Sequence, residues 1–463
     1  MQLSHALPAM SATFDEPNLV VSSGLIPAVG LAQRVGITDL ADRLVTVPGP
    51  AGANAGAKVM SLVAGMTAGA DSIDDLDVLR HGAMGRVFTG IKAPSTLGTF
   101  LRGFTFGHVR QLDAVAARTL IGLAEATPLL PGIDAGCVID IDDTVKPVFG
   151  ARKQGSEFGY TRVRGLNAQL ATISTAHGAP VIAATRLRRG ARNSAAGAVR
   201  MIRDTITTAR RCGATGPVLV RADSAYCSAA IITAISTAGA RFSVGIGMNP
   251  NVRRAIAAIH EEAWTRITYP QAIPDPQTGE LVAAAEVAEI AYTAFTSTPR
   301  SRQVTARWIV RRIPGLNKAK LAGQDPLFPL FRYHAIFTDN PADLITAEAQ
   351  HRGHAIIEQV IADLKHSALA HLPSGRFTAN AAWLVAAAIA FNLTRALGVT
   401  AAGRLAKATT ATVRAKIINI PARIARSARR LRLHLPANWL WATSWLRAWD
   451  HTLPPTTARP QAP

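Results

Sequence analysis

The hydrophobic and polar positions of the chain follow helical spacing first and strand spacing later. From residue 20 to about 125 apolar side chains recur with helical periodicity, which predicts a helical region. From Cys137 the pattern changes, because the apolar residues of VIDID alternate with acids. QLATIST (169–175) and PVIAATRL (180–187) follow at short spacing, with Gly and Pro in the gaps. We therefore predict three consecutive, mostly antiparallel strands.

Helical and strand patterns then alternate. Residues 195–213 and 226–240 have helical periodicity, whereas PVLVRAD (217–223) and RFSVGIGM (241–248) are typical of buried strands. Strands alternating with helices predict an α/β sheet. In such a sheet Asp223 lies at the carboxyl end of its strand.

A β-rich insertion interrupts this alternation between about 262 and 340. Its strand-like segments are RITYP, AEVAEIAYTAF, RQVTARWIVRRI and FRYHAIFTDN, separated by turn-rich loops that contain Pro. The helical pattern resumes at about 344, and we expect it to continue past 395.

The charge of the chain indicates a polyanionic partner. The 463 residues are 48% hydrophobic, which is enough for a large core, yet the formal net charge is +20 and the pI is about 11. This imbalance exceeds what solubility requires, so nucleic acid is the first expected partner. A basic face that only keeps the protein soluble is the alternative.

Cysteine usage and hydropathy favour a soluble protein of a reducing cytoplasm. Cys137, Cys212 and Cys227 fit neither a disulfide framework nor a metal knuckle. The N-terminus lacks the basic start and long apolar core of a signal peptide. The most apolar stretch, Ala381 to Phe391, is about half the length needed to span a bilayer.

Two segments are candidates for DNA recognition. LIPAVGLAQRVGITDLADRL (25–44) has two apolar-periodic segments joined through Gly36, which fits either a helix-turn-helix or plain helical packing. The segment from about 401 is strongly basic against one acid, Asp450, and its tryptophans suit either a nucleic-acid surface or a docked tail. Its basic residues are Arg404, Lys407, Arg414, Lys416, Arg423, Arg426, Arg429, Arg430, Arg432, Arg447 and Arg459, and its tryptophans are Trp439, Trp441, Trp445 and Trp449.

Carboxylates are placed where the predicted strands end. Asp142 and Asp140 lie on the same side of one strand because side chains alternate, and Asp223 ends a later strand that we expect to be a neighbour. Each acid alone could be an ordinary turn or cap residue. A hard divalent cation such as Mg²⁺ needs further oxygen ligands, so a third acid is required.

The helix predicted over 348–366 offers that third acid. His351, His354, Glu358 and Lys365 fall on one helical face. Alone, such a face is more often a solvated stripe, and without Cys or a further His nearby we do not expect the histidines to bind metal. The order strand, strand, helix within β-β-β-α-β-α-β-α is, however, the layout of a ribonuclease-H-like core.

We therefore expect an α/β fold with a ribonuclease-H-like mixed sheet and helices. The β-rich insertion would interrupt this core, and helical N- and C-terminal regions would flank it.

The same segments resemble a known family. IDIDDTVKPVFGARKQGSEFGYTRVRG, VRADSAY, and RGHAIIEQVIADLK followed by HLPSGRFTANAAWLVAAAIAFNLTRA are similar to the DDE transposases of bacterial insertion sequences, specifically the insertion-sequence thirteen-eighty family. The resemblance covers residues from about 90 to 450. It implies a ribonuclease-H-like catalytic domain with a β-stranded insertion between the second Asp and the Glu, where 262–340 falls.

Pattern and resemblance together divide the chain into five parts. These are a helical N-terminal region for DNA binding or dimerisation (1–130), the first part of the catalytic core (131–261), the β-rich insertion (262–340), the final helices of the core (341–400) and a basic C-terminal region (401–463).

The resemblance also implies the catalytic residues. By motif match they are Asp142, Asp223 and Glu358, which would hold Mg²⁺, or Mn²⁺ in its place, for DNA cleavage at transposon ends and strand transfer into target DNA. Related transposases carry Tyr-x-x-Arg-x-x-x-Glu-x-x-x-x-x-x-Lys, whose Tyr and Arg positions are His351 and His354 here. This departure affects the DNA-contacting role of the helix and not the metal role of its Glu.

The expected partners are transposon-end and target double-stranded DNA, and a second copy of the chain in a homodimeric synaptic complex. We expect a bacterial cytoplasmic protein without a membrane partner. Residues expected to contact DNA are Lys365, His354, Arg352, Arg162, Arg164, Arg188, Arg189 and Arg192, with Arg186 among them. The alternatives are a related metal-dependent nuclease that cuts without joining, and a catalytically inactive DNA-binding protein descended from a transposase.

Overall fold

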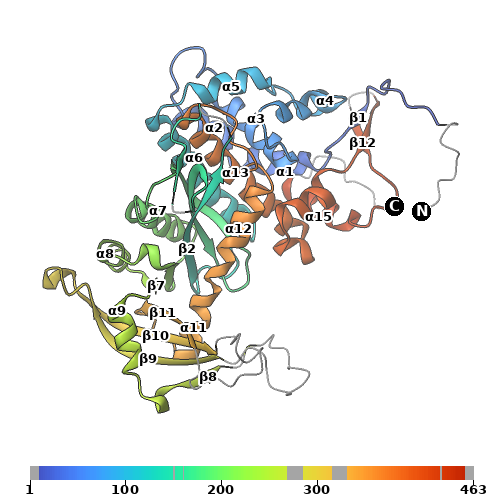
Figure 1. The fold of residues 1–463 in the computed structure, drawn as a ribbon. Coiled ribbons are helices and arrows are strands. Elements are labelled where there is room, and N and C mark those ends of the chain that lie inside the picture. The colour runs from blue at the N-terminus through green and yellow to red at the C-terminus, as the bar shows by residue number, and fades with distance from the viewer. Residues whose placement is uncertain are drawn as a thin grey trace.

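The computed structural model describes residues 10–149, 152–159, 161–267, 269, 285–314, 331–427 and 430–453. A ten-stranded mixed sheet runs through the molecule, and both ends of the described chain contribute to a separate three-stranded sheet (Figure 1). The large sheet has the order β3-β4-β2-β6-β7-β11-β10-β9-β8, and β5 pairs with β4. Its strands are β2 (Cys137–Pro147), β3 (Glu157–Phe158), β4 (Arg164–Ser174), β5 (Val181–Arg189), β6 (Val218–Ala222), β7 (Arg241–Ile246), β8 (Thr265–Ile267), β9 (Ala285–Ala294), β10 (Val304–Pro314) and β11 (Phe331–Thr338).

Strand β2 organises the first half of the sheet. It pairs antiparallel with β4 and parallel with β6, while β5 runs antiparallel to β4 and β7 runs parallel to β6. Helices α7 (Ala198–Arg211) and α8 (Ala229–Thr237) supply the crossovers that parallel strands require. The strands and helices predicted between 137 and 248 are therefore confirmed.

The insertion extends the same sheet. Its strand-like segments form β8 to β11, as the alternating pattern predicts, and β11 pairs antiparallel with β7. Residues 335–338 lie opposite 243–246 in this pairing, so backbone hydrogen bonds connect the insertion directly to the core sheet. Between β7 and β9 lie α9 (Pro250–Ala257) and the short turn η4 (Glu261–Ala263), and η5 (Arg300–Arg302) precedes β10.

The N-terminal region is helical, as its spacing predicts. It contains α1 (Leu25–Arg34), α2 (Ile37–Leu44), α3 (Ala55–Ala68), η2 (Asp74–Arg80), α4 (Met84–Val87), α5 (Pro94–Arg102) and α6 (Phe106–Ala126). Gly36, with φ of 72°, turns the chain between α1 and α2. Helix α2 buries Ile37 and Ala41 against its neighbours, and Asp42 accepts a 2.7 Å hydrogen bond from the Gly56 N–H at the start of α3. Because α2 packs against α3 and α6, plain helical packing is the interpretation that the structure favours.

The central core helix is α13 (Phe377–Ala401), which packs against α3, α6 and β5. The 25 residues of α13 are long and apolar enough for a membrane span, but 94% of its most apolar window is buried inside the protein. One of its two buried amides, that of Asn392, is hydrogen-bonded to the sheet. The Asn392 side chain accepts a 2.9 Å hydrogen bond from the Ile182 N–H and donates a 2.7 Å bond to the Ile182 carbonyl. Asn392 thereby provides hydrogen-bond partners for the backbone N–H and carbonyl of Ile182. These groups lie in β5 beside the point where its pairing with β4 shifts register.

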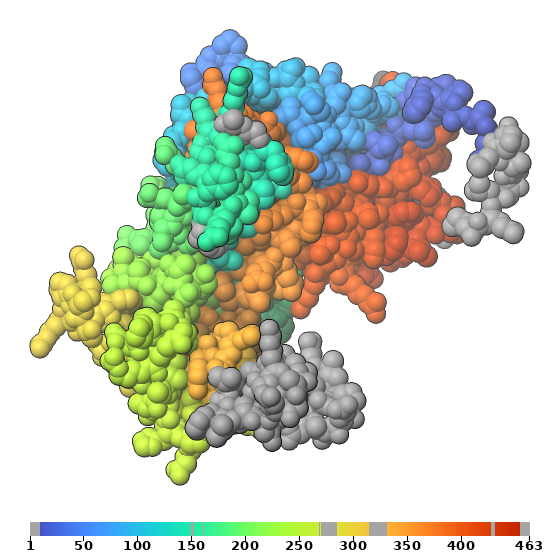
Figure 2. All heavy atoms as spheres, in the orientation of Figure 1, coloured from blue at the N-terminus to red at the C-terminus, as the bar shows by residue number. Residues whose placement is uncertain are grey.

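The C-terminal region packs back onto the N-terminal helices, as Figure 2 shows for the orange and red segment beside the blue one. Its elements are η7 (Gly403–Lys407), α14 (Thr410–Val413), the π-helical turn η8 (Arg414–Ile418), β12 (Ala422–Ser427), β13 (Arg430–His434) and α15 (Ala442–Thr452). Strand β12 pairs with β13 and with β1 (Leu19–Val20). Trp445 is buried, and Trp439 donates a 3.1 Å hydrogen bond to the Lys416 carbonyl. The tryptophans therefore dock this segment, whereas Arg429 and Arg459 lie outside the described residues.

Candidate active site

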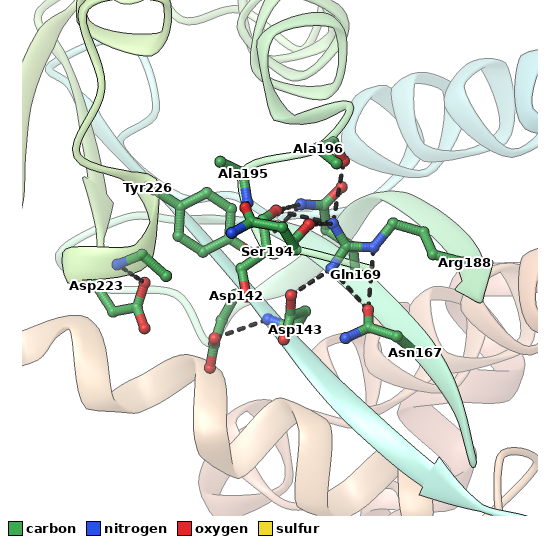
Figure 3. A network of polar contacts seen from close by, with 12 residues as sticks. Asp142, Asp143, Asn167, Gln169, Arg188, Ser194, Ala195, Ala196, Asp223 and Tyr226 are labelled. Atoms are coloured by element: carbon green, nitrogen blue, oxygen red, sulfur yellow. Dashed lines mark hydrogen bonds and ion pairs between the residues drawn. The ribbon is translucent and has the colours of Figure 1, made fainter. Parts of the chain in front are cut away.

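Asp142 and Asp223 lie side by side at one edge of the sheet. Strands β2 and β6 run parallel in a register that pairs Cys137 with Val218 and continues to Ile141 with Ala222. The next residue along each strand is the predicted aspartate. Asp223 directly follows the last residue of β6, whereas Asp142 lies in the middle of β2, so the prediction that the first strand ends at its acids is wrong. Figure 3 shows both carboxylates pointing away from the polar network around Arg188.

Neither carboxylate is neutralised by a basic partner. Within the described residues, Asp142 and Asp223 form no ion pair with Lys or Arg. Asp142 accepts a 2.7 Å hydrogen bond from the Asp143 N–H, and Asp223 accepts a 3.1 Å bond from the Ala225 N–H. Burial raises the pKa of Asp142 to about 6, and repulsion from Asp223 adds to this rise. Burial likewise raises the pKa of Asp223. The pair is therefore a concentration of negative charge without an Arg or Lys partner in the described part of the chain, although His354 and backbone N–H groups act to lower both pKa values.

The adjacent Asp143, by contrast, belongs to a buried ionic network. It pairs with Arg188, whose guanidinium also donates to the Asn167 side chain and to the carbonyls of residues 193, 194 and 196. Arg188 is 5% exposed. The prediction that Arg188 contacts DNA is therefore wrong, because all of its donors are directed into the protein. Next to it, Gln169 donates to Tyr226, which follows Asp223 in the short turn η3 (Ser224–Tyr226) (Figure 3).

Asp140 is also neutralised inside the protein. Its two oxygens accept 2.7 Å hydrogen bonds from Nε and Nη2 of Arg221, and its Oδ1 lies 2.8 Å from Nδ1 of His354. Asp140 is fully buried. Alternation does place it on the same side of β2 as Asp142, but the expectation that it might join the active site is not met. It has become an anchor for the helix that carries the third acid.

Glu358 lies in the first turn of α12 (Ile356–Lys365) and is exposed. The helix predicted over 348–366 is divided, because α11 (Leu344–Arg352) passes through the 3₁₀ turn η6 (Gly353–Ala355) before α12 begins. Helix α12 packs along β2. His354, in the turn before α12, is close enough to Asp142 to affect its pKa. At the other end of α12, burial lowers the pKa of Lys365, and Lys146 is close enough for its charge to lower that pKa further. Glu358 lies about one turn beyond His354, and its meeting with the two aspartates stays a prediction.

The described residues contain no group of three His, Cys, Asp or Glu side chains already arranged to hold a metal. The structure thus brings Asp142 and Asp223 together, while Glu358 lies on a separate element and forms no three-carboxylate cluster with them. Carboxylate oxygens are nevertheless the donors that Mg²⁺ and Mn²⁺ prefer, and an uncompensated buried pair suits a divalent cation.

Most of the other predicted DNA contacts lie at the end of the sheet beyond the acids. Asp142 pairs with Leu170 of β4. Four residues further along β2, Lys146 pairs with Leu166, and Leu166 pairs with Arg189 of β5, so Lys146 and Arg189 lie at the same level of the sheet. This places a basic row roughly 13 Å further along the strands. Arg162, Arg189 and Arg192 are exposed, and Arg164 is partly exposed.

Two predicted contacts lie elsewhere. Arg352 forms a 3.3 Å ion pair with Glu348 and covers the ring of Tyr269, on a different side of the helix from Glu358. Arg186 is partly buried, with Asp113 and Asp204 nearby.

Sequence reasoning missed Lys146. It lies in the DDTVKP segment that follows the first catalytic candidate, and burial together with the charge of Lys146 lowers the pKa of Lys365. The signal available in the sequence was its position four residues after Asp142, which places both on the same side of β2.

Comparison with known proteins shows the family of the chain. A model of the family described as transposase DDE domain group 1 matches residues 6–453. A search among curated proteins found no match to the chain. The family match spans both aspartates, the insertion and the helix of Glu358, and the chain therefore belongs to the transposase DDE domain group 1 family.

Proposed function

We propose that the protein is a DNA transposase that cleaves DNA at the ends of its element and joins those ends to target DNA. The observation that carries the proposal is the selective neutralisation of acids around β2. Asp140 and Asp143 are each paired with a buried arginine, whereas Asp142 and Asp223 have no Arg or Lys partner in the described part of the chain, and their pKa values are raised. Folding alone gives no reason to leave such a pair, but binding of an external cation does.

Divalent metal ions fit the donors present. Asp142 and Asp223 would hold the metal, with Glu358 of α12 completing its ligands. Bound Mg²⁺ or Mn²⁺ would supply Lewis-acid activation of water and stabilisation of the leaving 3′ oxygen.

The chain's own residues would bind and orient the substrates. The Asp143 N–H fixes one Asp142 oxygen through its 2.7 Å hydrogen bond, which leaves the other oxygen free for the ion. Lys146 and Lys365, beyond the acids on β2 and α12, supply positive charge for a DNA phosphate. Exposed Arg162, Arg189 and Arg192 extend this charge at the same end of the sheet.

The finer assignments belong to the same proposal. Strands β2, β4 and β5 are antiparallel, and β6 and β7 are parallel to β2, an order that supports a ribonuclease-H-like core. The motifs around the acids support membership of the insertion-sequence thirteen-eighty group. Joining two DNA ends calls for two copies of the chain, so we infer a homodimer in the synaptic complex, acting in the bacterial cytoplasm.

The test uses DNA ends taken from inverted repeats that flank the coding region. A pre-cleaved end, a supercoiled plasmid and Mg²⁺ are incubated with the protein, with Asp223→Asn as the matched control. Joined products that disappear in the variant support transposition. Nicking without joining would instead indicate a nuclease of the same core, and binding without either reaction would indicate an inactive descendant. If Asp223→Asn cuts as well as the parent, the site assignment is wrong.

A further inference from the structure

The joint between α11 and α12 is fastened to the sheet by three buried or nearly buried side chains. Asp140 of β2, Arg221 of β6 and His354 of η6 are called the Asp140 clamp below. Asp140 and Arg221 lie opposite each other in the parallel register, and Arg221 holds both carboxylate oxygens at 2.7 Å. The side chain of His354 is 15% exposed and lies 2.8 Å from the same carboxylate. Because a carboxylate can only accept, Nδ1 of His354 carries the proton and donates it.

Arg221 holds the joint from its other side. Its Nη1 donates to the backbone carbonyl of Gln350, in the last turn of α11. The clamp therefore grips the chain both before and after Gly353. A Cβ at Gly353 would lie 2.6 Å from Nη1 of Arg221, an atom that is already pinned by its hydrogen bonds. The absence of a side chain at Gly353 therefore leaves room for the Arg221 guanidinium to reach the Gln350 carbonyl.

We propose that the Asp140 clamp sets the position of Glu358 relative to Asp142 and Asp223, so that His354 is a positioning residue. This inference rests on the proposed function. Glu358 follows His354 by one helical turn, about 6 Å along the axis, so a fixed His354 fixes the start of α12. Glu358 is exposed and has no ion pair among the described residues, hence its own contacts do not hold it in place.

The clamp also explains the use of histidine at this position. Nδ1 of His354 donates to the Asp140 carboxylate inside the protein. This hydrogen bond orients the start of α12, and it directs the His354 side chain away from a DNA phosphate. Groups that orient metal ligands affect activity by about 10–100-fold without touching the substrate. The clamp is expected to act in this range.

The experiment compares His354→Leu, which removes the bond, with His354→Asn, whose amide nitrogen can replace Nδ1. His366→Leu is the matched control, because His366 is exposed directly after α12. Cleavage rate at saturating end DNA, DNA dissociation constant and thermal midpoint are measured for each. We expect His354→Leu to cleave about 10–100-fold more slowly with unchanged DNA affinity, and His354→Asn to recover most of the rate. Weaker DNA binding in both variants, with cleavage at saturation unaffected, would overturn the proposal.

A second readout is independent of catalysis. Hydrogen–deuterium exchange of the amides of residues 356–360 is measured without DNA or metal. Faster exchange in His354→Leu, but not in His354→Asn or His366→Leu, supports the clamp even if no cleavage is found. Unchanged exchange in His354→Leu refutes it. Glu358→Gln separates the two proposals, because full cleavage by that variant would refute the catalytic assignment and leave the clamp to be judged by exchange alone.

Discussion

Asp140 and Asp142 lie two residues apart on β2, and of the two only Asp140 is paired with an arginine. Asp143, the next residue, is paired with Arg188. The chain therefore neutralises the acids on either side of Asp142 and leaves the charge of Asp142 itself uncompensated. The two carboxylates therefore affect stability in opposite ways. The ion pair of Asp140 belongs to the folded structure, whereas the buried charge of Asp142 destabilises it.

Asp142→Asn is expected to stabilise the protein while abolishing cleavage. Burial and the neighbouring Asp223 raise the pKa of Asp142 to about 6, so its charged form is disfavoured in the fold at neutral pH. Removing that charge should raise the free energy of unfolding by on the order of 1 kcal/mol. Urea unfolding at pH 8 with a chelator measures this.

Asp140→Asn is the matched control for that prediction. The same chemical change should lower stability by about 3 kcal/mol or more, because it leaves the Arg221 guanidinium buried and unpaired. Equal losses for the two variants would contradict the distinct roles of the two acids.

The strands and the two aspartates could be predicted because their signals are local. Alternation in VIDID and the apolar run before Asp223 specify strands, and parallel strands bring their carboxyl ends to one edge. The register that aligns Asp142 with Asp223 is consistent with those patterns but is fixed by packing over the whole of β2 and β6.

The surroundings of the acids could not be predicted, because they depend on residues far apart in sequence. Arg188 and Arg189 are adjacent and the sequence predicts DNA contact for both, yet Arg188 is buried and Arg189 is exposed, since only Arg188 faces Asp143 and Asn167. Similarly, helical periodicity over 348–366 is continuous. At the break, Gly353 lies against Arg221, which is more than a hundred residues earlier in the sequence.

Replacing Arg188 should damage the fold rather than DNA contact. Arg188→Met leaves the Asp143 carboxylate buried without its partner and removes hydrogen bonds to the loop at 193–196, so we expect a loss of about 3–5 kcal/mol. Arg189→Met, at the next position, removes only an exposed contact 3.7 Å from Glu157 and should change stability by less than about 0.5 kcal/mol. Chemical denaturation of the two variants measures their free energies of unfolding. A large loss for Arg188→Met alone supports a buried structural role for Arg188, and equally small losses for both variants would contradict it.

His351 should make the protein sensitive to acid. Burial lowers the pKa of His351 to about 3, and the charges of His354 and Arg221 act in the same direction, against weaker opposing effects of a hydrogen bond with Ser243 and the charge of Asp140. Its ordinary pKa is near 6.5, so between pH 7 and 5 the unfolded chain takes up a proton that the folded chain refuses. Stability therefore falls as pH falls in this window, with a contribution of about 2 kcal/mol by pH 5. His351→Asn should show a correspondingly shallower loss of unfolding free energy from pH 7 to 5, and parallel curves for variant and parent would exclude this cause.

The ribbon formed by β12 and β13 is expected to bind DNA through its backbone phosphates. Arg423 lies opposite His434, and Arg432 lies opposite Ala425, so Arg423, Arg432 and His434 are exposed on one face, while Arg426 is exposed on the other. The sequence has no acid between Asp363 and Asp450, and a two-stranded ribbon can enter the major groove.

Replacing Arg423 and Arg432 together by alanine should weaken binding to transposon-end DNA. It should also reduce the magnitude of the slope of log affinity against log salt concentration by about 2. Binding releases counterions from each phosphate that an arginine contacts, so the loss of two contacts means that fewer counterions are released. The 3.7 Å contact between Arg423 and Glu16 is exposed and should cost little to lose. Arg300→Ala with Arg302→Ala removes the same charge from the exposed turn before β10. If this second pair lowers the slope equally, net charge alone drives binding; if the slope changes only for the ribbon, DNA lies along β12 and β13.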